Sequence, residues 1–342
     1  MEPEKNFHTQ TQHTKIKTPL SFAKSRRLLI KLVLIILYGL FSSISCKNSI
    51  FTKSPKLNDG KNEKISPATD DMPILDDFSN LNIVLVLGGL DAKGFANIGI
   101  LSGLEKHKIL PSRIIATGMG GLTAAFYSED TSSFSLEWKH FKLSDKIYFD
   151  FSLFQGKTGN IRPTALLNFI EENISAKRVE DLSLPITIVT TDIKTRKTHL
   201  IERGNLGKAI YSGIAIPGMF APIEYRNNVL FTGYLTEGLP IAIAIKKNPD
   251  AIIAIDLESG NNNESIKTTN DISFEALKST GEKLTSFHRN SANIFFIRPD
   301  LSSVKSMQFS DKKRIINIGL HTVDSIAIEL KKYLSTIKRR KM

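Results

Sequence analysis

One junction in the chain combines the residue types that hydrolases use to present a nucleophile. Residues 113–121 read Arg-Ile-Ile-Ala-Thr-Gly-Met-Gly-Gly, an apolar run that breaks at glycine and continues into apolar residues at helical spacing. Such a strand, sharp turn and helix can lift one side chain to the top of a sheet, where the helix N-terminus favours developing negative charge. The lifted position here is Gly118, which has no side chain to attack with.

Two further blocks give this junction a context. Residues 82–101, NIVLVLGGLDAKGFANIGIL, predict a buried strand, a glycine turn and a helix, and residues 184–240 contain LPITIVTTD, GNLGKAIYSGIAIPGMFAP and LFTGYLTEGLP. In this order the blocks resemble the bacterial patatin-like phospholipases. In that family the first block carries the oxyanion hole, the elbow carries a serine nucleophile, and the last block supplies the aspartate of a Ser-Asp dyad. The resemblance extends from about residue 82 to residue 334.

Matched position by position, the chain departs from the family at both halves of the dyad. Gly118 stands where the family has its serine, and Ala116 replaces the first glycine of the elbow motif. Thr232 stands where the family has its aspartate, and Tyr234 where a second glycine is usual. The other elbow positions are Thr117, Met119 and Gly120.

The turn that the resemblance assigns to the oxyanion hole is also altered. Leu90 and Asp91 replace its last two glycines, while Lys93 keeps the family's basic residue. We expect the carboxylate of Asp91 to lie beside the oxyanion donors and to oppose developing negative charge. The oxyanion-like positions are Gly88, Gly89, Leu90, Asp91, Lys93 and Gly94.

The resemblance implies an α/β fold of three layers, with a central, mostly parallel sheet flanked by helices. The residues agree, because the strand expected at 83–87 is apolar without alternation, as in a strand covered on both faces. A hairpin is expected over 223–231, turning at Asn227 and Asn228. The last helix has an apolar stripe from Ile316 to Ile337, which we expect to pack on the sheet.

Other polar residues and aromatic residues have less specific interpretations. Asp192 ends a strand and Ser212 lies in a helix-to-turn segment, and we expect both to be structural. The aromatic residues of segment 132–160 either pack one side of the domain or cover an acyl-chain groove. The histidines have no paired spacing, so neither a metal site nor a cofactor is expected.

The 342 residues are enough for one large domain with extensions. We expect a signal segment over 1–46, a polar, flexible tether over 47–80 and the patatin-like domain over 81–337. The net charge is +12 and is spread along the chain. This distribution favours a mild preference for anionic membrane surfaces and does not indicate binding to nucleic acid.

The N-terminal region carries a candidate anchor. Residues 32–41 are apolar, a run too short to span about 30 Å of hydrocarbon comfortably but suited to the core of a secretory signal. Cys46, the only cysteine, follows small residues and resembles the lipobox of bacterial lipoproteins. The resemblance implies an exported protein held at the cell membrane by lipid on Cys46. The alternatives are an uncleaved N-terminal membrane anchor and a buried core helix with an incidental thiol.

These features leave two hypotheses for function. In the first, the chain is a membrane-tethered pseudo-hydrolase that has lost its chemistry and binds a lipid or fatty acyl ligand, or acts as a scaffold; the sequence identifies no protein partner. In the second, it is an active lipid acyl hydrolase with displaced catalytic residues, for which Thr117 and Asp91 are the candidates near the elbow. Side chains alternate along a strand, so Thr117 is expected to point away from the apex.

Overall fold

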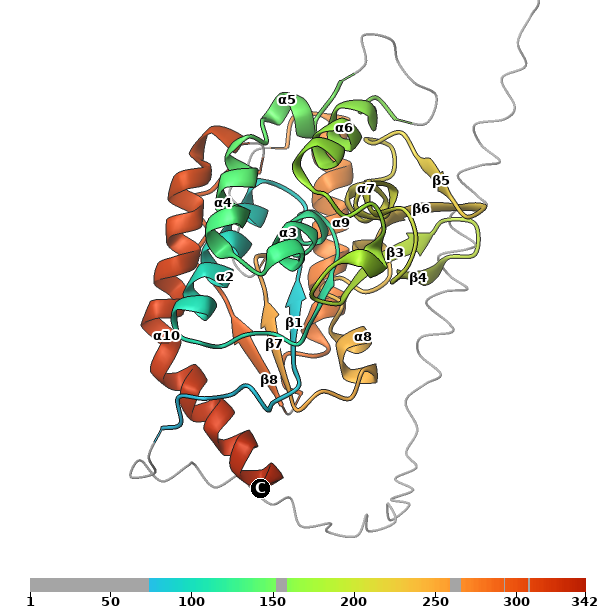
Figure 1. Ribbon diagram of the computed structural model, residues 1–342. Helices are drawn as coiled ribbons and strands as arrows, with labels where there is room; N and C mark the ends of the chain where they lie inside the picture. Colours follow the sequence, from blue (N-terminus) through green and yellow to red (C-terminus); the bar gives the residue numbers. More distant parts are fainter. Residues whose placement is uncertain (1–73, 152–158, 259–265, 292, 307) are drawn as a thin grey trace, which may run out of the picture. The chain divides into compact units, whose positions relative to one another are not determined.

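A computed structural model describes residues 74–151, 159–258, 266–291, 293–306 and 308–342 (Figure 1). They belong to one compact unit, Pro67–Met342. The predicted signal segment, which includes Cys46, and residues 47–73 of the predicted tether lie outside the described residues. Within the described ranges, no helix is long and apolar enough to cross a membrane.

An eight-stranded sheet lies at the centre of this unit. Its order is β5-β6-β3-β2-β1-β7-β8, and β4 also pairs with β3. The strands β3, β2, β1, β7 and β8 run parallel, whereas β4, β5 and β6 form the antiparallel pairs. The strand bounds are β1 (Ile83–Leu87), β2 (Arg113–Ala116), β3 (Ile186–Asp192), β4 (Lys197–Ile201), β5 (Ile223–Tyr225), β6 (Asn228–Thr232), β7 (Ala251–Ile255) and β8 (Ile294–Ile297).

Helices cover both faces of the sheet, as Figure 1 shows. Alternate residues of β1 enter different apolar clusters: Leu85 and Leu87 pack with residues of α2, α3, α7 and α10, whereas Val84 and Val86 pack with residues of α8. The expected three-layer α/β fold is confirmed. The helices are α2 (Ala96–Lys106), α3 (Met119–Asp130), α4 (Ser133–Phe141), α5 (Asp145–Tyr148), α6 (Thr164–Asn173), α7 (Leu206–Ile214), α8 (Ile241–Lys246), α9 (Thr269–Ser286) and α10 (Lys312–Lys341).

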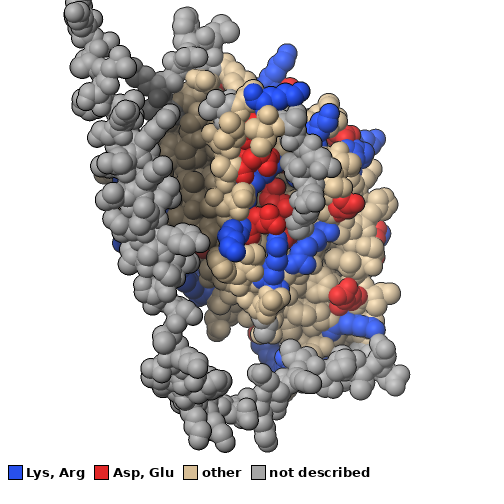
Figure 2. All heavy atoms as spheres, turned by 180° about the vertical axis from the view of Figure 1, so that it is seen from behind, with Lys and Arg blue, Asp and Glu red and all other residues tan. Residues whose placement is uncertain are grey.

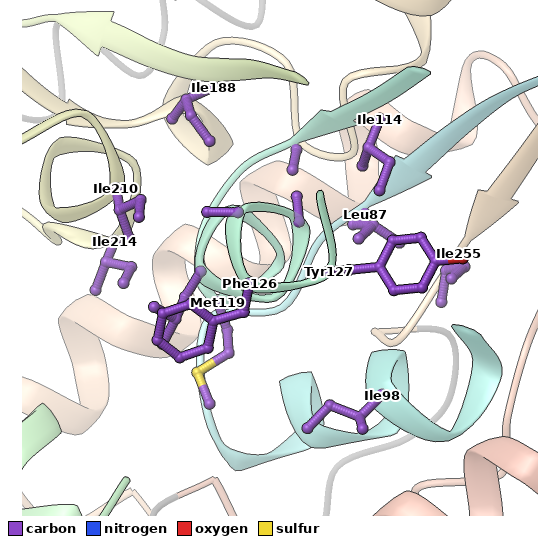
Figure 3. Packing of buried hydrophobic residues seen from close by; sticks show 14 of the residues in the cluster. Leu87, Ile98, Ile114, Met119, Phe126, Tyr127, Ile188, Ile210, Ile214 and Ile255 are labelled. Atoms are coloured by element: carbon purple, nitrogen blue, oxygen red, sulfur yellow. The ribbon is translucent and has the colours of Figure 1, made fainter. Parts of the chain in front are cut away.

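The larger of the two clusters surrounds α3, which follows the elbow. Figure 3 shows apolar side chains from several elements converging on this helix, among them Ile98 of α2, Ile188 of β3 and Ile210 of α7. All three are fully buried. The helix behind the elbow is therefore fixed by packing on several sides, and so is the turn that precedes it.

The long C-terminal helix packs differently from the expectation. Its apolar stripe was expected to lie on the sheet, but α10 has its main contact with α2 and only a smaller one with β8. Two glycines make this approach possible. A Cβ atom built on Gly99 would overlap the carbonyl oxygen of Ile316, and one built on Gly319 would overlap that of Ala96. Backbone therefore meets backbone, and α2 separates much of α10 from the sheet.

The hairpin between β5 and β6 also differs in detail. It turns at Arg226 and Asn227, which have φ angles of 48° and 67°, and not at Asn227 and Asn228. Asn228 instead begins β6 and pairs with Tyr225. A two-residue turn with both φ angles positive matches the twist of the strands. The pairing of Tyr225 with Asn228 therefore places the turn one residue earlier than the sequence predicted.

The contact between α2 and α10 leads to a stability prediction. Gly99→Ala should lower the free energy of unfolding by about 1–3 kcal/mol or more, because the methyl group would force the two helices apart. Urea denaturation of the purified protein measures this change. Gly207→Ala in α7 is the matched control, because its Cβ would lie 3.4 Å from the side chain of Leu167, an ordinary contact. Equal loss of stability in both variants would contradict a specific requirement for glycine at the α2–α10 contact.

Candidate functional site

The expected strand, turn and helix at the elbow is present. β2 ends at Ala116 and α3 begins at Met119. Between them Gly118 has φ 61° and ψ −142°, a conformation that costs a residue with a side chain about 1–3 kcal/mol. The N–H of Gly118 donates to the carbonyl oxygen of Gly213 at 2.9 Å. The turn therefore has the strained geometry of a nucleophile elbow but carries glycine at its apex.

The loop after β1 lies directly against this apex. The N–H of Met119 donates a hydrogen bond to the carbonyl oxygen of Gly89 at 2.6 Å. A Cβ atom built on Gly118 would overlap the same oxygen. In an elbow of this kind, the N–H of the residue after the nucleophile is an oxyanion donor. Here that donor already has a backbone acceptor, which occupies the space that a side chain at position 118 would need.

The side chain of Tyr234 closes the site from the other side. It extends from the short 3-10 helix η3 (Gly233–Leu235), and its hydroxyl oxygen accepts a hydrogen bond from the N–H of Gly89 at 2.5 Å. A Cβ atom on Gly281 of α9 would lie only 2.6 Å from its ring. Tyr234 is buried, and burial raises its pKa well above the ordinary value, so the phenol stays neutral. The ring thus fills the space between the loop after β1, the elbow and α9.

The two threonines beside the apex bond to each other and to the backbone. The hydroxyl of Thr117 donates to the carbonyl oxygen of Val189 at 2.9 Å and accepts from the N–H of Gly233 at 2.9 Å. Its oxygen lies 3.3 Å from the hydroxyl oxygen of Thr232. Both side chains are fully buried. Thr117 therefore points away from the apex toward β3 and η3, as strand alternation predicts.

The carboxylate of Asp91, which we expected to oppose developing negative charge, is engaged by two partners. One carboxylate oxygen accepts from the N–H of Lys93 at 2.8 Å and so caps the 3-10 helix η1 (Ala92–Phe95). The other lies 3.1 Å from the ammonium group of Lys278 on α9. Both side chains are buried. This ion-pair partner, nearly two hundred positions later in the sequence, offsets the charge of the carboxylate.

A second carboxyl group belongs to this buried charge cluster. Glu258 lies 4.0 Å from the ammonium group of Lys93. Burial, followed by the nearby charge of Asp91, raises the pKa of Glu258 to about 7.

Figure 2 shows acidic and basic side chains gathered on one face of the domain. In the C-terminal half, Arg289 and Arg298 lie 3.4 Å and 3.3 Å from Asp256. Charges of opposite sign therefore pair along this side of the sheet.

The remaining oxyanion-like positions support the loop by packing. Leu90 is buried, and a Cβ atom on Gly88 would overlap the hydroxyl of Tyr234. A Cβ atom on Gly94 would lie 2.5 Å from the side chain of Met119, and one on Gly120 would lie 2.8 Å from the backbone of Leu87. These glycines keep the loop after β1 and the first turn of α3 in close contact.

Asp192 and Ser212 have the structural roles that the sequence indicated. The carboxylate of Asp192 accepts from the N–H of Lys194 at 3.1 Å and from the hydroxyl of Thr195 at 2.9 Å, so it caps the turn after β3. The hydroxyl of Ser212 donates to the carbonyl oxygen of Lys208 within α7. Among the described residues, no group of three or more His, Cys, Asp or Glu side chains could hold a metal ion.

Two residues of the site have roles that the sequence did not reveal. Tyr234 was visible as a departure from glycine, but nothing in its local pattern showed that its hydroxyl would reach Gly89. Lys278 lies in an ordinary amphipathic helix pattern, and no sequence signal paired it with Asp91. A large side chain at a position that is usually glycine was the one available signal for a filled site.

Comparisons with known proteins agree with this geometry. Residues 85–245 match the family described as patatin-like phospholipase. An uncharacterized NTE family protein of Mycobacterium tuberculosis is 27% identical over 179 residues, covering 52% of this chain and 50% of that protein. Human patatin-like phospholipase domain-containing protein 6 is 29% identical over 203 residues, covering 54% of this chain and 14% of that protein.

Two further similarities are more distant. Lysophospholipase NTE1 of Scheffersomyces stipitis is 21% identical over 277 residues, covering 72% of this chain and 18% of that protein. The crystal structure of VipD from Legionella pneumophila aligns with a TM-score of 0.41 and 10% identity, covering 71% of this chain and 66% of that one.

The matched segment contains the parts on which the site depends. It begins in β1, includes the loop after β1, the elbow and η3, and ends in α8. The chain spans half or less of the length of the curated relatives it matches. Residues 85–245 are thus a patatin-like phospholipase domain.

Proposed function

We propose that this protein is a membrane-tethered pseudo-hydrolase, which keeps the patatin-like fold and acts by binding lipid or as a scaffold without hydrolysing esters. The observation that carries the proposal is the carbonyl oxygen of Gly89. It accepts the N–H of Met119 and occupies the space that a side chain on Gly118 would need. The same atom thus leaves no room for a nucleophilic side chain and keeps one oxyanion donor paired.

Ester hydrolysis needs a nucleophile, a base and donors for the oxyanion. Gly118 supplies no nucleophile, and Thr232 supplies no carboxylate base. The N–H of Met119 already donates to the carbonyl oxygen of Gly89, and the N–H of Gly89 already donates to the hydroxyl of Tyr234. In serine hydrolases that lack triad residues, a residual rate of about 10³–10⁴ over water depends on the oxyanion donors and on substrate binding. With these donors already paired, we expect even less here.

The alternative is an active lipid acyl hydrolase with displaced catalytic residues. Its support is the family and the printed name of one relative, a lysophospholipase. Thr117 would be the nucleophile, but its hydroxyl is committed to Val189 and Gly233. The ring of Tyr234 would also have to leave the site before an ester could approach. The buried hydrogen bonds therefore favour a binding role.

The membrane part of the proposal rests on the N-terminal sequence. The apolar run at 32–41 and the single cysteine at position 46 support an exported lipoprotein that is lipid-anchored at the cell membrane, with an uncleaved N-terminal anchor as the alternative. A lipid or fatty acyl ligand fits this location and the family. The filled elbow indicates that such a ligand binds elsewhere than above Gly118.

The first prediction concerns activity. The purified protein should release no product above background from p-nitrophenyl butyrate or from lysophosphatidylcholine, because no hydroxyl group is free at the elbow. If turnover is found, Thr117→Val and Ser212→Ala show which hydroxyl group is the nucleophile, since each variant removes one buried hydroxyl. Turnover that disappears in Thr117→Val and persists in Ser212→Ala would establish the displaced-nucleophile alternative.

The second prediction concerns restoring the site. Gly118→Ser with Thr232→Asp should remain inactive, because the carbonyl oxygen of Gly89 still blocks the apex and Tyr234 still fills the site. Adding Tyr234→Gly should give labelling by a fluorophosphonate probe, since the loop after β1 can then move away. Thr232→Asp with Tyr234→Gly, which lacks the serine, is the matched control. Equal labelling of the triple variant and of Gly118→Ser with Thr232→Asp would show that Tyr234 does not block the site.

The third prediction concerns the tether. In a bacterial host, Cys46→Ala should release the protein from the membrane fraction or leave its signal segment unprocessed, because the thiol accepts the lipid. Fractionation and electrophoretic mobility measure both effects. Cys46→Ser is a closer match in size and should behave as Cys46→Ala does. A variant that fractionates and migrates like the wild type would contradict lipidation at Cys46.

A further inference from the structure

Helix α4 has large apolar side chains on the side that faces away from the domain. Its inner side carries Leu136 and His140, which are fully buried. Its outer side carries three aromatic residues at spacings of four and three: Phe134 is 82% exposed, Trp138 63% and Phe141 39%. Residues at these spacings lie on one face of a helix. The segment that we expected either to pack or to cover a groove therefore divides, with part of its aromatic surface open to solvent.

The outward orientation of this face is fixed by contacts on the other sides of the helix. At the start of α4, the hydroxyl of Ser132 accepts a hydrogen bond from the N–H of Ser135. At its end, the ammonium group of Lys312 donates to the carbonyl oxygens of His140 and Phe141 at 3.2 Å and 3.0 Å. The inner side packs against α2 and α3. The aromatic face is thus a defined surface of a well-anchored helix.

Charged side chains flank the aromatic face. Lys142 follows Phe141 directly and donates to the side-chain oxygen of Asn173 at 3.1 Å, Lys146 lies in α5, and both are exposed. Lys139 pairs with Glu129 at 2.6 Å and so lies to one side. Glu137 and Asp145 are the acidic residues of the same segment. The local excess of lysine is small, but it has the sign of the whole chain, whose net charge is +12.

We propose that the face formed by Phe134, Trp138 and Phe141, with the exposed Lys142 and Lys146 next along the chain, docks onto the surface of an anionic phospholipid bilayer. Tryptophan and phenylalanine with adjacent lysines are the residues that hold amphipathic helices in a lipid interface. A net positive charge is attracted to anionic headgroups. The surface deepens the membrane location proposed above, but it depends neither on lipidation of Cys46 nor on the loss of hydrolysis.

The chain provides its own probe for this proposal, because Trp138 is its only tryptophan. The full-length Cys46→Ala protein, which cannot carry the lipid, is mixed with vesicles of phosphatidylcholine and phosphatidylglycerol. The emission of Trp138 should shift to shorter wavelength, and brominated acyl chains should quench it. Vesicles of phosphatidylcholine alone should give a weaker response.

A matched pair of variants tests whether this face is responsible. Phe134→Glu should weaken partitioning into the anionic vesicles about tenfold or more, because it removes an exposed ring that would enter the lipid interface and adds a negative charge. Ile328→Glu alters a side chain of α10 that is 67% exposed and should leave partitioning nearly unchanged. Circular dichroism confirms that both variants are folded. An equal effect of the two substitutions would overturn the assignment to α4.

Three other outcomes would also overturn the proposal. Vesicle binding by sedimentation without a change in Trp138 emission would place the contact elsewhere on the chain. Emission at short wavelength before vesicles are added, with a mass that rises with concentration, would show that a second copy covers the face. The same emission from a monomer would point to residues 32–41 of the chain itself. None of these readouts depends on esterase activity, so failure here leaves the proposed loss of hydrolysis untouched.

Discussion

The hydrogen bond from the N–H of Met119 to the carbonyl oxygen of Gly89 joins the loop after β1 to the elbow, and the arrangement of the site depends on it. Both sides need glycine: Gly89 has φ 106° and Gly118 has φ 61°. Because the two backbones touch, there is no room for a side chain at the apex. The N–H of Gly89 donates to the hydroxyl of Tyr234 on η3, so both polar groups of Gly89 are paired.

The departures from the family pattern fit one another physically. A glycine at position 118 leaves space for a carbonyl oxygen, and a tyrosine at position 234 supplies an acceptor for the amide that this arrangement leaves buried. An unpaired buried N–H costs about 1–3 kcal/mol, so the tyrosine stabilises the closed site. Asp91 pairs with Lys278 on α9. Restoring one catalytic residue alone would therefore meet several stabilising contacts at once.

The same rigidity serves the outer surface. α2 and α10 approach closely through Gly99 and Gly319, and α4 packs on α2 and α3. A helix held in this way can present bulky side chains to a partner without losing much conformational entropy on binding. The domain thus combines an elbow closed by the carbonyl oxygen of Gly89 and the ring of Tyr234 with an exposed aromatic face on α4.

The amino-acid sequence by itself determined several elements of the fold and the residue types at the elbow. The apolar run before Gly118, the helical spacing after it and the strand at 83–87 are local patterns, and they predicted β1, β2, α3 and the parallel sheet. The sequence also identified Gly118 as the residue at the apex of the elbow, because the turn between strand and helix lies there. These predictions succeeded because the spacing of apolar residues and the position of a glycine determine structure within a few residues of the chain.

Only the tertiary structure decided which side chains meet. Tyr234 reaches Gly89 across 145 positions of the chain, and no local pattern encodes that distance. Helix α4 is apolar on two sides, so its spacing alone could not decide whether Leu136 or Trp138 would be buried. The decision came from packing, because the inner side meets α2 and α3 while no described element covers the outer side enough to bury Phe134 or Trp138.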